Sequence, residues 1–199
     1  MSTATVFSEV FAPELFVLLV TTIVAGYELW GSDICASALA ARTTTVLFAW
    51  IVAFAVYEGG SSIFSVSVPG SEDFFASIGL ITGFVIIWFV WVRKGWGPLL
   101  QLFSLLLIGT SIVHMAVVPF WDVSSHVIYS AISTCFLCSL NRRFAVFLFV
   151  PIGLVWSRIA IEAHTVVEAV GGLVFAGVII AVALRVGAVP RTRTDSFGR

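Results

Sequence analysis

Long apolar runs constrain this chain more than any other sequence feature. Seven of them follow one another along its 199 residues, separated by short polar connections. A helix satisfies its backbone hydrogen bonds within one segment, so an apolar run of about 20 residues is typical of a helix that crosses a membrane. We therefore expect helices over residues 15–30, 44–57, 74–92, 98–118, 127–140, 144–156 and 165–184.

Composition also indicates a membrane protein and excludes an ordinary soluble domain. Hydrophobic residues make up 60% of the chain and charged residues 11%, whereas soluble domains average roughly 45–50% and about 25%. The sequence has no repeat and no second domain, so we expect one integral membrane domain over residues 1–199. The predicted fold class is all-α: a polytopic transmembrane helical bundle of six to seven spans. Its expected partners are membrane lipids and not nucleic acid.

The basic residues predict the orientation of this bundle. Arg42, Arg93-Lys94 and Arg142-Arg143 lie in alternate connections, and further arginines follow the last run. Cytoplasmic loops are enriched in Lys and Arg, so this pattern places the N-terminus outside the cytoplasm and residues 187–199 inside it as a tail. We expect an integral protein of a plasma membrane, of the bacterial inner-membrane kind, with seven spans.

Three runs need further explanation as membrane spans, the first because of a charge and the other two because of their length. The run over 15–30 carries Glu28, so a tilted or peripheral segment is the alternative there. The runs over 127–140 and 144–156 are short, and they reach an acceptable length only if they extend through residues 124–126 and 157–158. These polar residues would then lie slightly below the membrane surface and face the bundle, where a lipid headgroup would meet them.

A polar segment late in the chain carries the residues best suited to chemistry. His164 and Glu168 are four residues apart. On a helix they would share one face, where the carboxylate can accept the imidazole Nδ1–H and leave Nε2 free as a base or nucleophile. Arg158 adds a permanent charge on a planar fork that suits phosphate or carboxylate. Together these residues predict an anion site that contains a nucleophile.

This segment resembles the third motif of the phosphatidic acid phosphatase type 2 superfamily, which contains membrane lipid phosphatases. That motif reads Ser-Arg, five residues, His, three residues, Asp. Ser157-Arg158, His164 and Glu168 match it in spacing, with Glu in place of Asp. The resemblance covers about residues 95–185, which we expect to form a phosphatase-like core.

The other two motifs of the superfamily match less completely. The second, Pro-Ser-Gly-His, resembles residues 123–126, where Ser124 and His126 match while Val123 and Ser125 depart. The first, a Lys followed six residues later by Arg-Pro, has no counterpart in this sequence. Without the Lys and Arg of this motif, the site has fewer positive charges to neutralise the negative charge of the transition state. His114 lies upstream of Ser124, in the part of the chain from which a substitute for the missing Lys would come.

The resemblance implies a role for each matching residue. His164 would attack phosphorus, Glu168 would orient it, and His126 would protonate the leaving oxygen. The phosphoryl oxygens would be held by Arg158, Ser124, Ser125 and Ser157. The implied activity is hydrolysis of a phosphomonoester or diphosphate of a lipid, such as a polyprenyl diphosphate, phosphatidic acid or phosphatidylglycerol phosphate. The reaction would pass through a phosphohistidine at the non-cytoplasmic face, without a metal or another cofactor.

Two other functions remain open at the level of the sequence. On the same fold, a phosphotransferase would pass the phosphoryl group to another lipid or a sugar. A protein with a degenerate site would merely bind an anionic lipid headgroup, and the missing first motif favours this alternative. A histidine-ligated haem protein is disfavoured, because His126 and His164 are expected at one membrane face and His114 has no evident partner for ligation.

Overall fold

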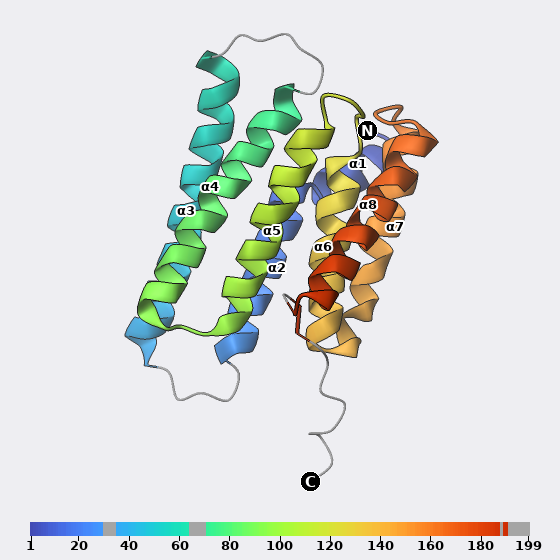
Figure 1. Ribbon diagram of the computed structural model, residues 1–199. Helices are drawn as coiled ribbons and strands as arrows, with labels where there is room; N and C mark the ends of the chain where they lie inside the picture. The colour runs from blue at the N-terminus through green and yellow to red at the C-terminus, as the bar shows by residue number, and fades with distance from the viewer. Residues whose placement is uncertain (30–34, 64–70, 188, 191–199) are drawn as a thin grey trace. The chain divides into compact units, whose positions relative to one another are not determined.

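Residues 1–29, 35–63, 71–187 and 189–190 are described by a computed structural model of the protein. All regular structure among them is helical (Figure 1). The expected cytoplasmic tail over 187–199 lies almost entirely outside the described residues. The helices are α1 (Thr3–Val10), α2 (Pro13–Leu29), α3 (Ala36–Ile63), α4 (Ser71–Lys94), α5 (Pro98–Val117), α6 (Ser125–Leu140), the 3-10 helix η1 (Arg142–Leu148), α7 (Phe149–Ala160) and α8 (Val166–Arg185).

These helices confirm the prediction of an all-α protein, and the number that could cross a membrane, five or six, is at or below the lower end of the expected six to seven. In the described part of the chain, five helical segments are long and apolar enough to cross a membrane: α3, α4, α5, η1 with α7, and α8. The pair α1 and α2, bent by 45°, makes six if it counts as one span. α6 is apolar but has only 16 residues. Each of the seven expected runs falls on one of these helices.

The two short runs gain length in the way that the sequence requires. α6 begins at Ser125 and therefore includes His126, while α7 continues to Ala160 and includes Ser157 and Arg158. The segment before α7 is a 3-10 helix over Arg142–Leu148. A 3-10 helix rises about 2.0 Å per residue instead of about 1.5 Å, so it lengthens a span that has few residues.

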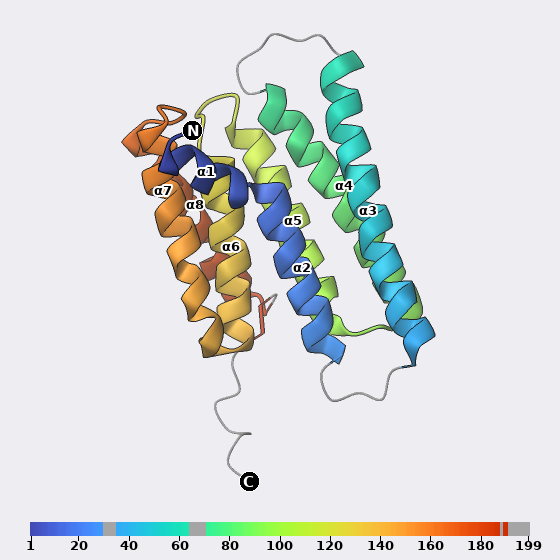
Figure 2. The same ribbon diagram turned by 180° about the vertical axis from the view of Figure 1, so that it is seen from behind.

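The chain divides into two compact units, which we describe separately. Residues 1–20 and 126–199 form the first, here called the motif unit because it contains the third motif. Residues 21–125 form the second, called the α3–α5 unit. Figure 2 shows the ribbon from behind. α2 contributes residues to both units, and the chain passes from one unit to the other between Ser125 and His126.

Small residues allow α3 and α4 to approach closely in the α3–α5 unit. A Cβ atom added at Gly79 of α4 would lie 2.6 Å from the backbone oxygen of Ala53 in α3. One turn further along α4, a Cβ at Gly83 would lie 3.1 Å from the backbone oxygen of Ala49. Small residues at four-residue spacing on two facing helices are a common device for close backbone contact in membranes. Packing of α3 on α4 therefore depends on these glycines.

Glu28, the carboxylate within the first apolar run, has partners of its own in the α3–α5 unit. It accepts hydrogen bonds from the Trp91 indole N–H at 2.9 Å and from the backbone N–H groups of Leu99 and Leu100 in the first turn of α5. A negative charge is favourable at this end of a helix. Gly97, which caps α5 with a φ of 130°, leaves space for the carboxylate. Residues 13–29 therefore form a regular helix in spite of this charge.

In the motif unit, α6, α7 and α8 lie side by side and alternate in direction (Figures 1 and 2). The short connections between them leave no room for a crossover. The start of α6, the end of α7 and the start of α8 consequently meet at one end of the unit. The candidate residues His126, Arg158 and His164 all belong to this end.

α1 also belongs to the motif unit and packs on α7. The ring of Phe7 makes edge contacts with the rings of Phe149 and Trp156, each at a centroid distance of 6.4 Å. Gly153 of α7 provides the space for this ring, because a Cβ atom there would collide with it. On the same helix, the small side chains of Ala4 and Ser8 are buried.

Candidate functional site

The backbone of the connection between α7 and α8 fixes the spacing between Arg158 and His164. The carbonyl oxygen of Arg158 accepts hydrogen bonds from the N–H of Ala163 at 3.1 Å and from the N–H of His164 at 3.2 Å. The chain turns at Glu162, whose φ of 57° lies in the left-handed region that non-glycine residues rarely adopt. The five residues between Arg158 and His164 thus form a turn that these hydrogen bonds close.

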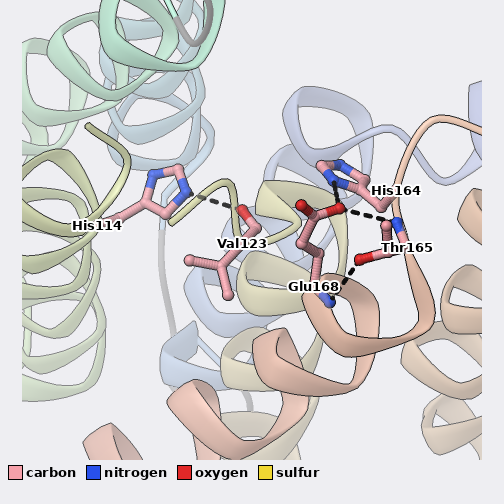
Figure 3. Close-up of polar contacts among 5 residues, drawn as sticks. All are labelled: His114, Val123, His164, Thr165 and Glu168. Carbon is pink, nitrogen blue, oxygen red and sulfur yellow. Dashed lines mark hydrogen bonds and ion pairs between the residues drawn. The ribbon is translucent and has the colours of Figure 1, made fainter. Parts of the chain in front are cut away.

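His164 lies directly after this turn, and Glu168 lies in the first turn of α8. The imidazole Nδ1 is 3.8 Å from Oε2 of Glu168 (Figure 3). The side chain of His164 is 5% exposed and that of Glu168 is 25% exposed, so the imidazole is almost entirely covered while the carboxylate is partly open. The distance exceeds that of a hydrogen bond by almost 1 Å. The carboxylate is therefore close enough to attract a charged imidazole but does not hold a neutral one.

Glu168 instead bonds to the backbone of Thr165 (Figure 3). Its Oε2 accepts from the Thr165 N–H at 2.8 Å, and the Thr165 hydroxyl oxygen accepts from the Glu168 N–H at 3.3 Å. This reciprocal pair is a capping box that satisfies the first N–H groups of α8. The sequence contained its signal, Thr-x-x-Glu, which the interpretation of Glu168 as an orienting carboxylate overlooked.

Ser157 and Arg158 both bond to α1. The Ser157 hydroxyl donates to the carbonyl oxygen of Ala4 at 2.6 Å, and Nη1 of Arg158 donates to the Ser8 hydroxyl oxygen at 3.2 Å. Ser157 has one hydroxyl hydrogen, so in this arrangement it does not offer a donor to a phosphate oxygen. The guanidinium of Arg158 has five N–H groups in a planar fork, a geometry that suits an anion such as phosphate.

His126 belongs to the same end of the motif unit. Its imidazole lies within the electrostatic influence of Arg158 and of His164. The Nδ1 atoms of His126 and His164 are both buried, and neither has a hydrogen-bond partner among the described residues. A buried polar atom without a partner is costly, because the water it loses is not replaced. Two imidazoles with such atoms beside a guanidinium are well suited to binding an anion.

Ser124 and Ser125 precede His126 in the chain and belong to the α3–α5 unit. The Ser125 hydroxyl donates to Oδ1 of Asp73 at 2.8 Å, which occupies its only hydrogen. The hydroxyl of Ser124 is fully buried and has no hydrogen-bond partner in the part of the chain that the structure describes. Of these two serines, Ser124 has the unsatisfied hydroxyl.

His114 is completely buried in α5. Its Nδ1 lies 3.2 Å from the Ser77 hydroxyl, and its Nε2 lies 3.4 Å from the carbonyl oxygen of Val123 (Figure 3). Both ring nitrogens thus have partners within the α3–α5 unit. This pairing is that of a structural histidine, and it supplies no permanent charge of the kind that the missing first-motif Lys would provide.

Sequence reasoning missed the contribution of α1. Residues 1–12 are short and lie outside the region of resemblance, so no contact with the third motif was expected from them. Two local signals were available: Ser2 caps the helix by accepting from the Thr5 N–H, and Pro13 starts the next helix after a bend. They predict a helix, but they do not predict what it contacts.

No group of three or more His, Cys, Asp or Glu side chains in the described residues is arranged to hold a metal ion. Comparison with protein-family models, with curated proteins and with solved structures finds no match to this chain. At one end of the motif unit, the residues offer two imidazoles and one guanidinium, a set of groups suited to binding an anion.

Proposed function

We propose that this protein is a membrane lipid phosphatase, a divergent relative of the phosphatidic acid phosphatase type 2 superfamily. It would hydrolyse a phosphomonoester or diphosphate of a lipid at the non-cytoplasmic face. The observation that carries the proposal is that His126, Arg158 and His164 belong to one end of the motif unit (Figure 1), and that neither Nδ1 atom has a hydrogen-bond partner among the described residues. Few structural roles require two such imidazoles next to a permanent positive charge.

The location of the three residues supports a lipid phosphate as the ligand. They lie at the ends of α6, α7 and α8, two of which are apolar enough to cross a membrane in the described structure. Ionisable groups in such positions are expensive unless they face a polar ligand or each other. The acyl or prenyl chains of a lipid would remain in the bilayer while its phosphate reaches the helix ends.

Nucleophilic attack would begin the reaction. The lone pair on Nε2 of His164 would form a bond to phosphorus, and the bond from phosphorus to the lipid oxygen would break. The negative charge of the bound phosphate would favour the protonated form of His126, which would then donate its proton to that leaving oxygen. Arg158 would bind the equatorial oxygens, on which negative charge accumulates. The product is a phosphohistidine, with the lipid alcohol or lipid monophosphate released.

Water would complete the cycle. The neutral His126 left by the first step would accept a proton from a water molecule, whose oxygen attacks the phosphohistidine. The bond between phosphorus and nitrogen breaks, inorganic phosphate leaves, and His126 is protonated again. No electron transfer and no metal is needed for this balance. Attraction between the imidazolium of His164 and Glu168, 3.8 Å away, would favour its orientation once charge develops.

One observation favours a second candidate, a non-catalytic protein that binds anionic lipid headgroups. The Glu168 carboxylate bonds to the Thr165 N–H and not to His164. A histidine without a bonded carboxylate is a weaker nucleophile, because its tautomer is not fixed. Such a site would still bind phosphate through Arg158 and the two imidazoles.

Phosphate release separates these candidates. The purified protein in detergent would be given phosphatidic acid, phosphatidylglycerol phosphate and a polyprenyl diphosphate, with a chelator present. Hydrolysis is expected for at least one lipid, and it should be lost in His164→Ala but retained in His114→Ala, which removes a histidine from the α3–α5 unit. Loss of the lipid phosphate only after addition of an acceptor alcohol, with the phosphorylated acceptor and no inorganic phosphate as product, would indicate a phosphotransferase. Lipid binding without any release would favour the binding protein.

A further inference from the structure

The first helix of the chain contacts both members of the Ser-Arg pair. Ser157 donates to the backbone oxygen of Ala4, and Arg158 donates to the hydroxyl oxygen of Ser8. Ala4 and Ser8 are four residues apart, so they lie on one face of α1, and both are buried. The whole α3–α5 unit lies between α1 and this Ser-Arg pair in the sequence.

The register of α1 on α7 is fixed by packing and not by these two hydrogen bonds alone. Phe7 occupies the space above Gly153, between the rings of Phe149 and Trp156. A shift of α1 by one residue would move this ring away from Gly153, which is the only glycine of α7, and against a position that carries a side chain. Ser8, next to Phe7, is consequently held at one position relative to Arg158.

Arginine needs such a partner because its side chain has several rotatable bonds. An unrestrained guanidinium would lose much of that freedom on binding phosphate, which weakens binding. Ser8 is 4% exposed, so the bond from Nη1 is shielded from competing water. With Nη1 bound to Ser8, the remaining N–H groups of the planar fork have a defined direction.

We infer that Ser8 is a positioning residue of the anion site: it orients Arg158 for phosphate, and α1 is thereby part of that site. This inference rests on the proposed function, in which Arg158 binds the phosphoryl oxygens. It adds a residue that the sequence resemblance does not include, at the opposite end of the chain.

Two measurements on the same variants test this inference. The first is binding of inorganic phosphate to the intact protein in detergent, measured as the shift in melting temperature. It reports on the anion site without turnover. Phosphate release from dioctanoyl phosphatidic acid reports on kcat/KM. Ser8→Ala should weaken phosphate binding and lower kcat/KM by about tenfold, the scale of one hydrogen bond to a charged group. Thr3→Ala, which removes an exposed hydroxyl from the same helix, should change neither.

A double-mutant cycle distinguishes positioning from a general structural role. If Ser8 acts through Arg158, Ser8→Ala has no further effect on phosphate binding in an Arg158→Ala background. If it merely stabilises α1, its effect is the same in both backgrounds, and the inference is overturned. If Ser8→Ala folds poorly, Ser8→Thr and Ser8→Val replace it as the test. Their side chains have equal shape, but only Thr keeps the hydroxyl oxygen that accepts the hydrogen bond from Arg158. Binding should then be retained in Thr and weakened in Val.

The two measurements also separate this inference from the proposed function. Phosphate binding that depends on Ser8, in a protein that releases no phosphate from any lipid, would support the positioning role and refute the phosphatase. Phosphate release that depends on His164 but is unaffected by Ser8→Ala would refute the positioning role and support the phosphatase. An intact protein that binds no phosphate would overturn the inference outright.

Discussion

Removing the carboxylate of Glu28 should destabilise the protein strongly. Its two oxygens accept from the Trp91 indole and from the Leu99 and Leu100 N–H groups. Glu28→Ala leaves these three donors without their acceptor. An unsatisfied buried donor costs about 1–3 kcal/mol, and we take the lower value because the carboxylate is only half-buried. The expected loss is therefore about 3 kcal/mol, or a fall in melting temperature of about 6–12 °C.

Thermal unfolding in detergent, followed by tryptophan fluorescence and circular dichroism, would measure this loss. Glu28→Gln should lie between the intact protein and Glu28→Ala, because one oxygen remains as an acceptor while the charge at the start of α5 is removed. Glu14→Ala is the matched control: it removes an exposed carboxylate from the first turn of the same helix and should cost at most about 1 kcal/mol. Equal melting temperatures for Glu28→Ala and Glu14→Ala would refute the reasoning.

Two further predictions concern backbone geometry. Glu162 has a left-handed φ of 57°, which glycine adopts more easily than other residues. Glu162→Gly should therefore raise the melting temperature by a few degrees, corresponding to about 1 kcal/mol, while Glu162→Val should lower it. Thermal unfolding of both variants checks the sign. Gly79→Ala places a Cβ atom against the Ala53 backbone and should lower the free energy of unfolding by about 1–3 kcal/mol. Gly26→Ala is the control: its Cβ meets nothing within 4 Å, so it should be neutral or stabilising. Similar melting temperatures for these two variants would contradict close packing of α3 on α4.

Helix positions were predictable from the sequence because apolar runs of span length have few alternatives. Every expected run falls on a helix, and the extension of α6 and α7 through polar residues followed from span length alone. The role of Glu28 was not predictable, because its partners lie 63 to 72 residues further along the chain. A charge within an apolar run shows that a partner is needed but not where it lies.

The candidate site was predictable only in part. The spacing between Arg158 and His164 reflects a closed turn, so a local pattern identified residues that the fold brings together. Glu168 has a local partner, Thr165, which competes with His164 for the same carboxylate oxygen. Ser8 could not be found from sequence, because its bond to Arg158 joins residues 150 positions apart. Hydroxyl groups give no periodic signal, so such long-range contacts appear only with the fold.

Isolation of a phosphoryl–protein intermediate tests the central claim most directly. The intact protein would be mixed with phosphatidic acid or a polyprenyl diphosphate carrying radioactive phosphorus, denatured within one turnover, and digested. The account predicts a label on His164 that survives alkali and is lost in acid, as expected for a phosphohistidine, and no label in His164→Ala. Hydrolysis by the intact protein without label on His164, or undiminished hydrolysis by His164→Ala, would contradict it.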